Sequence, residues 1–491
     1  MISVLVFFPA LVALVLLCVP RANTALLKGI ALAGALGTFA LSLVLLPVAP
    51  AGIAQDSYDW IHGAVAASYH VRVDGTSVWF GLLTTFLTVP AVLAAFTYRD
   101  TARLRGYLAL LLGFEWTLLG LFTAGDLLLF YIYWDLMLIP VFLALVAYAD
   151  TPEARRAAWA YLIYNLAGGL VFLAGVIGVV LKTHTFEVLG NTFAIDPELQ
   201  RWLFAAFALA FLIKTPVFPF HAWMPPAYTQ SPSSLVSMIS GVQSKAGLYG
   251  FIVFAMPLFP AAAHYFAPAL LVLAASSIVY GALCAIAERN AKTLVAYTSL
   301  SHLGLVLLAL FAFDVTSLPA SILMIVSHGV IAAALFLLVG FIEERVATNE
   351  LAAYGGLQAV APRLWVFMLI AAMALLGLPG LSGFAGEFLI LIGAWQTQPV
   401  YASFALFTIV LAAVYALRLL QGAMHGPLRL PPGVPAPKDL QPRELALVAP
   451  LLAAIFFLGV WPAWLNDRTP GQSAARPGVW HIVQPFPGHR S

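Results

Sequence analysis

Three charged side chains lie within stretches of the chain that otherwise have the composition of membrane-spanning helices. They are Lys214 in FALAFLIKTPVFPF, Lys245 in VSMISGVQSKAGLYGF and Glu387 in GLPGLSGFAGEFLIL. A charge at the centre of a bilayer costs at least ~2.5–3.5 kcal/mol on insertion scales, so such residues are rare and usually carry function. Each of the three lies near a helix-breaking proline or glycine. This combination predicts a pathway for ions or protons.

Asp135, in LLFYIYWDLMLIPVF, is a fourth charged residue inside an apolar run. It could be a carboxylate that is hydrogen-bonded at a bend near Pro140, or the counter-ion of a buried lysine. Lys214 is the natural partner in the second case, because an opposite charge within ~4–6 Å keeps both groups ionised. We expect Lys214 and Lys245 to act in proton transfer rather than to reach the membrane surface.

Four residues in these and other apolar helices each have two possible interpretations. Glu387 could tie down backbone N–H groups freed by the break before it, or act as the terminal proton carrier. His302 and His328 could relay protons, since the unperturbed imidazole titrates near pH 6.5, or be ordinary hydrogen-bonded core residues. Glu115 could belong to the same pathway or make a polar contact between helices.

Two predicted spans are interrupted by residues that cannot continue a helix. Proline lacks a backbone N–H and clashes with the preceding turn. Such breaks at membrane depth are tolerated only where protein or a water-filled cavity surrounds them. Paired breaks in two halves of a chain indicate inverted repeats and a transport site. We therefore expect broken helices near residues 214–220 and 378–386, with Pro216, Pro219, Pro379 and Gly380 at the breaks.

The composition indicates an all-α polytopic membrane protein, because 62% of the 491 residues are hydrophobic and only 9% are charged. Apolar runs of about 17–25 residues each fit one helical span, and we count about 14 of them. We expect no strands apart from a hairpin in an outer loop, near residues 66–75 or 183–195. The centres of the runs are Leu11, Leu36, Thr88, Thr117, Ile139, Phe172, Ala208, Val242, Ser277, Val306, Ala332, Leu375, Ile409 and Ala454.

Lysine and arginine concentrate in alternate loops, which predicts the orientation. The positive-inside rule places the basic loops in the cytoplasm, so both termini are expected outside. The other loops carry only Arg72, Lys182 and Arg201. The basic set is Arg21, Lys28, Arg99, Arg103, Arg105, Arg155, Arg156, Arg289, Lys292, Arg345, Arg363, Arg429, Lys438 and Arg443.

Redox cofactors and metal ions are not expected in this chain. The only two cysteines are Cys18 and Cys284, whereas an iron–sulfur cluster usually needs about four cysteine ligands. No histidine–carboxylate spacing resembles a metal site, and there is no phosphate-binding loop, nucleophile elbow or basic cluster for nucleic acid.

Several stretches resemble the antiporter-like subunits of respiratory complex I, and within that set the M type. The resemblance covers nearly the whole chain and extends to the helix count. Glu387 is the discriminating residue, because the L-type and N-type subunits and the sodium/proton antiporter subunits typically carry lysine there. The most specific stretches are LFYIYWDLMLIP, LIKTPVFPFHAWMPPAY, AYTSLSHLGLVLL, SHGVIAAALFLLVG and LPGLSGFAGEFLILIGAW.

The resemblance implies a role for each buried polar residue. Asp135 and Lys214 would form the pair of the first half-channel, Lys245 would connect the two half-channels, and Glu387 would be the exit residue. His302 and His328 match polar residues of the central axis, and Glu115 matches an acid on the fourth helix. The family usually has glutamate at the position of Asp135, and aspartate is one methylene shorter than glutamate. The other departures from the pattern are Pro226, Tyr228, Gln230, Gln243 and Ser244.

We therefore predict a proton-translocating subunit of NADH:quinone oxidoreductase, in the inner membrane beside L-type and N-type neighbours, with redox chemistry in partner subunits. The alternative is a subunit of a multi-subunit cation/proton antiporter or of a membrane-bound hydrogenase complex. A purely structural membrane protein is disfavoured by the cost of its buried charges. The expected divisions are N-terminal helices 1–106, half-channel repeats 107–256 and 257–424, a linker 425–444, a last span 445–466 and a polar tail 467–491.

Overall fold

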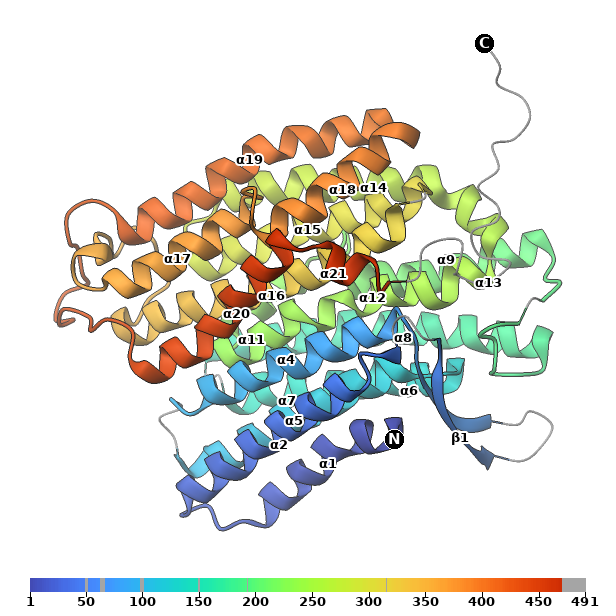
Figure 1. Ribbon diagram of the computed structural model, residues 1–491, viewed down its shortest axis with the longest axis horizontal. Coiled ribbons are helices and arrows are strands. Elements are labelled where there is room, and N and C mark those ends of the chain that lie inside the picture. Colours follow the sequence, from blue (N-terminus) through green and yellow to red (C-terminus); the bar gives the residue numbers. More distant parts are fainter. Residues whose placement is uncertain are drawn as a thin grey trace.

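A computed structural model describes residues 1–48, 52–61, 67–97, 101–148, 151–191, 193–314 and 316–469. The helices lie side by side across one bundle, with their connecting loops gathered at its two ends (Figure 1). Most of the predicted tail, from residue 470 onward, lies outside the described residues.

The first half of the chain forms the lower part of the bundle as Figure 1 shows it. Its elements are α1 (Ile2–Cys18), α2 (Thr24–Val44), β1 (Ala54–Ile61), β2 (Ala67–Val73), α4 (Ser77–Ala95), α5 (Thr101–Thr123), α6 (Leu127–Leu136), α7 (Leu138–Tyr148), α8 (Pro152–Thr183), α9 (Pro197–Lys214), α10 (Met224–Gln230), α11 (Ser233–Gly241), η1 (Gln243–Lys245), α12 (Ala246–Gly250), η2 (Phe251–Ala255) and α13 (Met256–Leu258).

The second half packs above it. Its elements are α14 (Pro260–Ala287), α15 (Ala291–Ala312), α16 (Ser317–Val346), η3 (Leu357–Ala359), α17 (Pro362–Leu375), α18 (Ser382–Thr397), α19 (Pro399–Met424), α20 (Pro442–Val460) and α21 (Ala463–Asn466).

The predicted spans correspond to helices. Within the described residues, ten helices are long and apolar enough to cross a membrane, and each contains one predicted centre. The four remaining centres fall in short or interrupted helices. Leu11 lies in the short α1, Ala208 in α9, and Val242 and Leu375 at helix breaks.

Burial is graded from the middle of the bundle outward. The membrane-length windows of α15 and α16 are 94% buried, whereas those of α2 and α19 are 33% buried. Large apolar side chains remain exposed on outer helices, such as Leu181 on α8 and Val410 on α19. Exposed apolar surface of this extent marks a membrane or protein interface.

One hairpin interrupts the helical pattern. β1 pairs antiparallel with β2, with Ala54 opposite Val73 and Tyr58 opposite Tyr69. The expected hairpin near 66–75 is therefore half right, since it supplies only the second strand. The other expected position, 183–195, is wrong, because the described residues of that stretch contain no strand.

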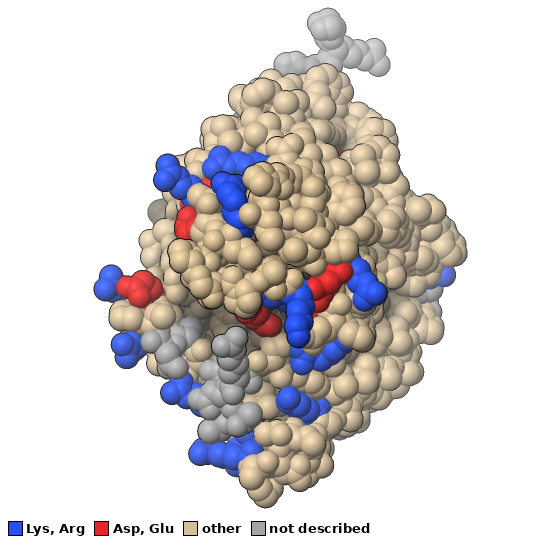
Figure 2. Space-filling model, turned by 90° about the vertical axis from the view of Figure 1, so that its left-hand side faces the viewer, with Lys and Arg blue, Asp and Glu red and all other residues tan. Residues whose placement is uncertain are grey.

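The basic loops come together at one end of the bundle, on the left in Figure 1. Arg105 donates to the carbonyl of Leu17 at 3.0 Å, and Arg345 donates to that of Lys438 at 2.8 Å. Figure 2 looks onto this end and shows Lys and Arg spread over it among fewer acidic side chains. We call it the basic end; Arg99 of the predicted set lies outside the described residues.

The N-terminus and the last described residues lie at the opposite end. The Met1 amino group is 3.0 Å from Asp56 in the hairpin. Trp464, after the last span, packs against Trp79 at the start of α4, with ring centroids 5.3 Å apart. An even number of crossings follows from this placement.

The two predicted breaks are present. α9 ends at Lys214 just before Pro216, and the chain resumes helix at Met224. α17 ends at Leu375 and α18 begins at Ser382. The structure also has an irregular segment around Lys245 that the sequence analysis did not predict. Between α11 and α12 the backbone leaves the α-helical geometry at Val242 and passes through a 3₁₀ turn, and a π-helical turn follows at Phe251–Ala255.

Candidate functional site

Lys214 is the last residue of α9 and its side chain is buried, with 1% of the residue exposed. Its Nζ lies 3.5 Å from the carbonyl oxygen of Trp134 and 4.8 Å from the centroid of the Trp134 ring. Both contacts suit an ammonium group, because the carbonyl accepts a hydrogen bond and the aromatic face attracts a cation. The break at Pro216 ends the helix where this side chain is held.

Asp135 precedes the break between α6 and α7 and is close to Lys214 without a direct ion pair. The two charges interact electrostatically, but no ion pair within 4.0 Å joins them. The Asp135 carboxylate instead lies against Gly169 of α8, where a Cβ would collide with Oδ1. The Asp135 carboxylate therefore lies beside α8 rather than in an ion pair with Lys214.

Lys245 is fully buried at the unpredicted break in the middle of the molecule. Its Nζ donates to the carbonyl of Ser240 and to the hydroxyl of Ser244, the latter at 3.1 Å. A regular α-helix would use that carbonyl for the backbone N–H of residue 244. The irregular turn thus makes a backbone acceptor available to the lysine.

The segment around Lys245 makes close contacts with α8 and with the break after Lys214. Gln243 donates to the Tyr161 hydroxyl on α8 at 2.5 Å. Gly247, just after Lys245, allows the hydroxyl of Thr215 to approach so closely that a Cβ there would collide with it. The breaks after α9 and after α11 therefore lie against each other.

Beyond Lys245 the polar side chains continue through two histidines to Glu387. His328 on α16 interacts electrostatically with Lys245, and its ring centroid is 5.3 Å from that of His302 on α15. His302 Nε2 lies 3.3 Å from Glu387 Oε1 and 3.5 Å from the Tyr415 hydroxyl. Neither ring nitrogen of His328 has a hydrogen-bond partner among the described residues.

Glu387 borders a small cavity and a glycine that the break requires. The cavity has a volume of about 20 Å³ and is also lined by His302, Ser301 and Tyr415, which is room for about one water molecule. Gly377 has a φ of 78°, and a Cβ on it would lie 2.5 Å from Glu387 Oε2. The glycine is thus needed for the turn and for the space beside the carboxylate.

We call six of these side chains the polar row: Asp135, Lys214, Lys245, His328, His302 and Glu387. Glu115 on α5 is fully buried beside Thr88 and is not one of them. Its carboxylate oxygens have no hydrogen-bond partner in the described part of the chain.

Several residues of the site were not singled out from the sequence. Trp134 and Tyr161 contact the lysine-bearing segments, Ser240 supplies the carbonyl for Lys245, and Tyr415 approaches His302. Trp134 could have been suspected from its place next to Asp135. The others come from helices far along the chain, and nothing in their local sequence indicates the contact.

Comparisons with known proteins give the family. The family described as "NADH:quinone oxidoreductase/Mrp antiporter, TM" matches residues 124–412. The chain belongs to this family. Within the described residues, no three His, Cys, Asp or Glu side chains gather as metal ligands would.

Relatives in the family are similar over nearly their full lengths. NADH-quinone oxidoreductase subunit M of Rhodobacter capsulatus is 34% identical, over 99% of this chain and 97% of its own. Subunit M of Mycobacterium tuberculosis is 33% identical, over 98% and 96%. NADH-ubiquinone oxidoreductase chain 4 of Chondrus crispus is 32% identical, over 94% of each chain.

Solved structures show the same fold. A chain of respiratory complex I from Thermus thermophilus with bound NADH superimposes with a TM-score of 0.86 at 34% identity, covering 96% of this chain and 98% of that one. A chain of the Mrp complex from Dietzia sp. gives a TM-score of 0.87 at 21% identity, covering 98% of each. The second likeness shows the fold alone.

Proposed function

We propose that this chain is the proton-translocating membrane subunit M of an NADH:quinone oxidoreductase. The observation that carries the proposal is the polar row, which crosses the bundle through its most buried helices. Family membership and the relatives named as subunit M support the same assignment.

The row can transmit a change of charge from one member to the next. At an effective dielectric constant of about 20, two unit charges ~4 Å apart interact by about 4 kcal/mol, a factor of about 10³ in a protonation equilibrium. Moving Lys214 toward or away from Asp135 by a few ångströms would therefore change whether Lys245 and the histidines hold a proton. The titrations belong to the coupled groups rather than to single residues.

Each residue has a role in this scheme. Asp135 modulates the charge of Lys214, Lys245 connects the two halves, His328 and His302 relay, and Glu387 releases the proton. Glu115 would act on the row through the field of its charge. The helix breaks provide the space that water needs to reach buried side chains.

The wider setting belongs to the same proposal. The half-channel repeats are residues 107–256 and 257–424, related by inverted topology. The basic end faces the cytoplasm by the positive-inside rule, so both termini lie outside. The chain lies in the inner membrane beside L-type and N-type subunits, and all redox cofactors belong to partner subunits. The alternative role in a cation/proton antiporter is supported by the shared fold and by the family description, which names both kinds of protein.

The test is NADH-driven acidification of inverted membrane vesicles that carry the whole complex with Lys214→Ala, with NADH oxidation followed in parallel. We expect both activities to collapse while the complex still assembles. Lys182→Ala is the control, because Lys182 is an exposed lysine at the end of α8. Unchanged acidification in Lys214→Ala would overturn the proposal and favour the antiporter role, which a sodium-dependent proton flux without NADH would then identify.

A further inference from the structure

A large cavity lies at the basic end of the bundle. Its volume is about 850 Å³, which is within the range of ligand-binding clefts in proteins. Its walls include the ends of α4 and α16, the start of α11 and the linker that leads into α20. Among the described residues that line it, none belongs to the polar row. The proposed function therefore does not account for this cavity.

Some of the charged side chains in the walls already have a partner of opposite charge. Arg345 at the end of α16 lies 2.7 Å from the Glu444 carboxylate. The neighbouring Glu343 forms an ion pair with Lys292. These groups are neutralised within the protein and need no ligand.

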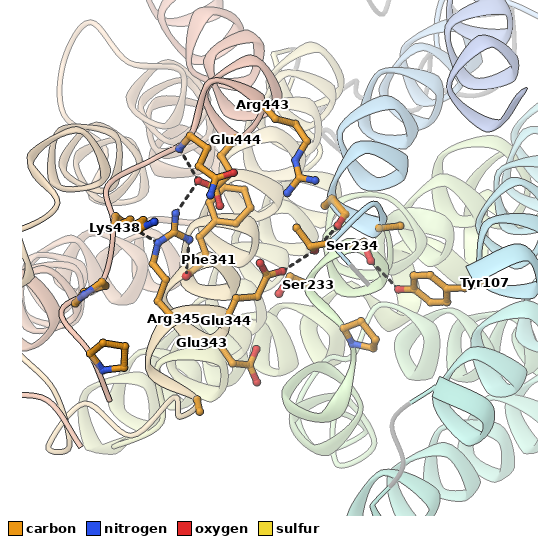
Figure 3. A pocket seen from close by; sticks show the side chains of 18 of the residues that line it. Tyr107, Ser233, Ser234, Phe341, Glu343, Glu344, Arg345, Lys438, Arg443 and Glu444 are labelled. Carbon is orange, nitrogen blue, oxygen red and sulfur yellow. Dashed lines mark hydrogen bonds and ion pairs between the residues drawn. The ribbon is translucent and has the colours of Figure 1, made fainter. Parts of the chain in front are cut away.

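Arg443 and Lys438 also line the cavity, but their side chains have no hydrogen bond or ion pair with any described residue. Arg443 lies in the first turn of α20 and is half-buried, and Figure 3 shows its guanidinium group turned into the cavity. A guanidinium carries five N–H donors and stays charged. Its planar set of donors suits a phosphate group in particular. Two unpaired cations in one cavity therefore favour a ligand that carries phosphate.

A carboxylate faces Arg443 across the cavity. Glu344 at the end of α16 accepts a hydrogen bond from the Thr97 hydroxyl at 2.8 Å. It interacts electrostatically with Arg443, but no ion pair within 4.0 Å joins them. In Figure 3 the two side chains approach from different helices with a space between them. A ligand that fills this space would present a negative group to Arg443 and a positive group to Glu344.

The rest of the lining is largely apolar and lies near the outside of the bundle. It includes Ala94 and Ala95 of α4, Phe341 of α16, and Pro435 and Pro437 of the linker. α20 is an outer helix, since its membrane-length window is only 39% buried, and it lies on the near face in Figure 1. The cavity is therefore at the ends of membrane-spanning helices, which is the level where basic pockets bind lipid headgroups.

We propose that this cavity binds the headgroup of phosphatidylethanolamine, a zwitterionic phospholipid with a primary amine. The phosphate lies against Arg443 and Lys438, the ammonium group donates to the Glu344 carboxylate, and the apolar walls cover the glycerol. A purely anionic headgroup would be repelled by Glu344. Phosphatidylcholine could not donate a hydrogen bond to Glu344, because its ammonium group is fully methylated. This inference does not depend on the proposed proton pathway.

The test uses the whole complex that contains this chain, reconstituted into phosphatidylcholine vesicles with a phosphatidylethanolamine probe whose acyl chain carries a photoreactive group near the glycerol. After irradiation, mass spectrometry measures the labelling of peptides from residues 341–347 and 435–444. We expect labelling in the wild type and about tenfold less in Arg443→Gln, which loses a charge-assisted contact to phosphate. Arg363→Gln is the control, because Arg363 is an exposed arginine that does not line the cavity. Its labelling should equal that of the wild type.

Glu344→Gln tests whether the ligand is a zwitterion. The variant loses the partner of the ammonium group and no longer repels an anionic headgroup. Labelling by the phosphatidylethanolamine probe should therefore fall, whereas labelling by the corresponding phosphatidylglycerol probe should rise. The same change for both probes, or no change for either, would overturn the proposed choice of headgroup.

Competition distinguishes a lipid from a soluble ligand with the same headgroup chemistry. Unlabelled phosphatidylethanolamine should displace the probe, and phosphoethanolamine in solution should not. Displacement by phosphoethanolamine alone would overturn the lipid and identify a soluble phosphate ester. Wild-type labelling in Arg443→Gln would overturn the site itself. If that variant fails to assemble, Lys438→Gln decides, because reduced labelling supports the site and unchanged labelling overturns it.

Discussion

The Asp135 carboxylate owes its position to a residue that has no side chain. A Cβ on Gly169 would collide with Oδ1 and lie within 3.0 Å of the carboxylate carbon. The acid therefore fits against α8, within electrostatic range of Lys214. A glycine on a neighbouring helix thus belongs to the site although it carries no functional group.

Gly169→Ala should impair pumping to the extent that Asp135→Asn does, because the methyl group displaces the carboxylate from its place near Lys214. Overpacking of this kind also costs about 1–3 kcal/mol of stability. The measurement is vesicle acidification alongside the amount of assembled complex. Gly113→Ala on α5 is the matched control, since nothing lies within 4 Å of a Cβ there. Wild-type pumping by Gly169→Ala would contradict this account of Asp135.

At the scale of the elements, the break between α17 and α18 combines a backbone turn with the placement of a carboxylate. Gly377 and Gly380 both have positive φ, at 78° and 92°. A Cβ on Gly377 would press on Glu387, whereas one on Gly380 would meet nothing within 4 Å. Variants at the two glycines can therefore distinguish the backbone conformation that the turn requires from the space that Glu387 requires.

Gly377→Ala and Gly380→Ala should each lower stability by about 1–2 kcal/mol, the cost of a left-handed conformation for a residue with a Cβ. Only Gly377→Ala should also reduce pumping, because it displaces Glu387 from His302. Thermal inactivation of the complex gives the first quantity, and acidification at a temperature where both variants are intact gives the second. Equal pumping by the two variants would show that Glu387 tolerates the displacement.

The hairpin is fastened to α1 through the Asp56 carboxylate, which the Met1 amino group and the backbone N–H and hydroxyl of Ser3 all approach within 3.0 Å. The backbone hydrogen bond from Ser3, with help from the N-terminal charge, lowers the pKa of Asp56. A lowered pKa in the folded state means that folding favours the ionised form. This stabilisation is present above the ordinary pKa of aspartate and is lost as the pH falls through the lowered value.

Asp56→Asn should therefore loosen the hairpin at neutral pH, by at most about 1 kcal/mol because the pair is close to solvent. Faster amide hydrogen exchange over residues 54–61 is the expected result. The difference from the wild type should shrink at acidic pH, where the wild-type carboxyl is also protonated. Asp59→Asn, on an exposed strand position, serves as the control. A pH-independent difference would mean that the ion pair does not hold the hairpin.

At the scale of the whole molecule, one arginine supplies several of the polar contacts that hold the linker before the last span against the bundle. Arg345 at the end of α16 donates to the carbonyls of Lys438 and Asp439 and to the Glu444 carboxylate, at 2.8, 3.3 and 2.7 Å. Glu444 is 3% exposed. The linker 425–444 is thereby held over the cavity at the basic end.

Arg345→Ala should release the linker and the start of α20. Removing one partner of a buried ion pair costs about 3–5 kcal/mol, because the other charge is left without compensation. The measurement is proteolytic cleavage within residues 430–441 in right-side-out and in inverted membranes. We expect cleavage to be faster in the variant than in the wild type, and to occur only from the cytoplasmic side. Arg156→Ala, at an exposed position on α8, should leave the cleavage rate unchanged, and an equal rate in Arg345→Ala would contradict this role.

The spans, the two breaks and the identity of the buried ionisable residues could all be predicted from the amino-acid sequence. These features are local: about 20 apolar residues cross a membrane wherever they occur, and Pro216 or Pro379 ends a helix without reference to its neighbours. The alternation of basic loops also predicted that the loops would be sorted to two ends, as the structure shows. The assignment of roles to the polar residues and the division into repeats remain predictions.

Which polar groups meet could not be predicted, because it depends on how the helices pack. His302 and Glu387 are 85 residues apart and Tyr107 and Ser234 are 127 apart, and their contacts depend on how α5, α11, α15 and α18 pack. The break at Lys245 contains no proline. There the lysine side chain takes the backbone acceptor that a regular helix would use for its own hydrogen bond. Side-chain spacing along a helix is fixed by the local backbone, whereas distances between helices are fixed by the packing of the whole bundle.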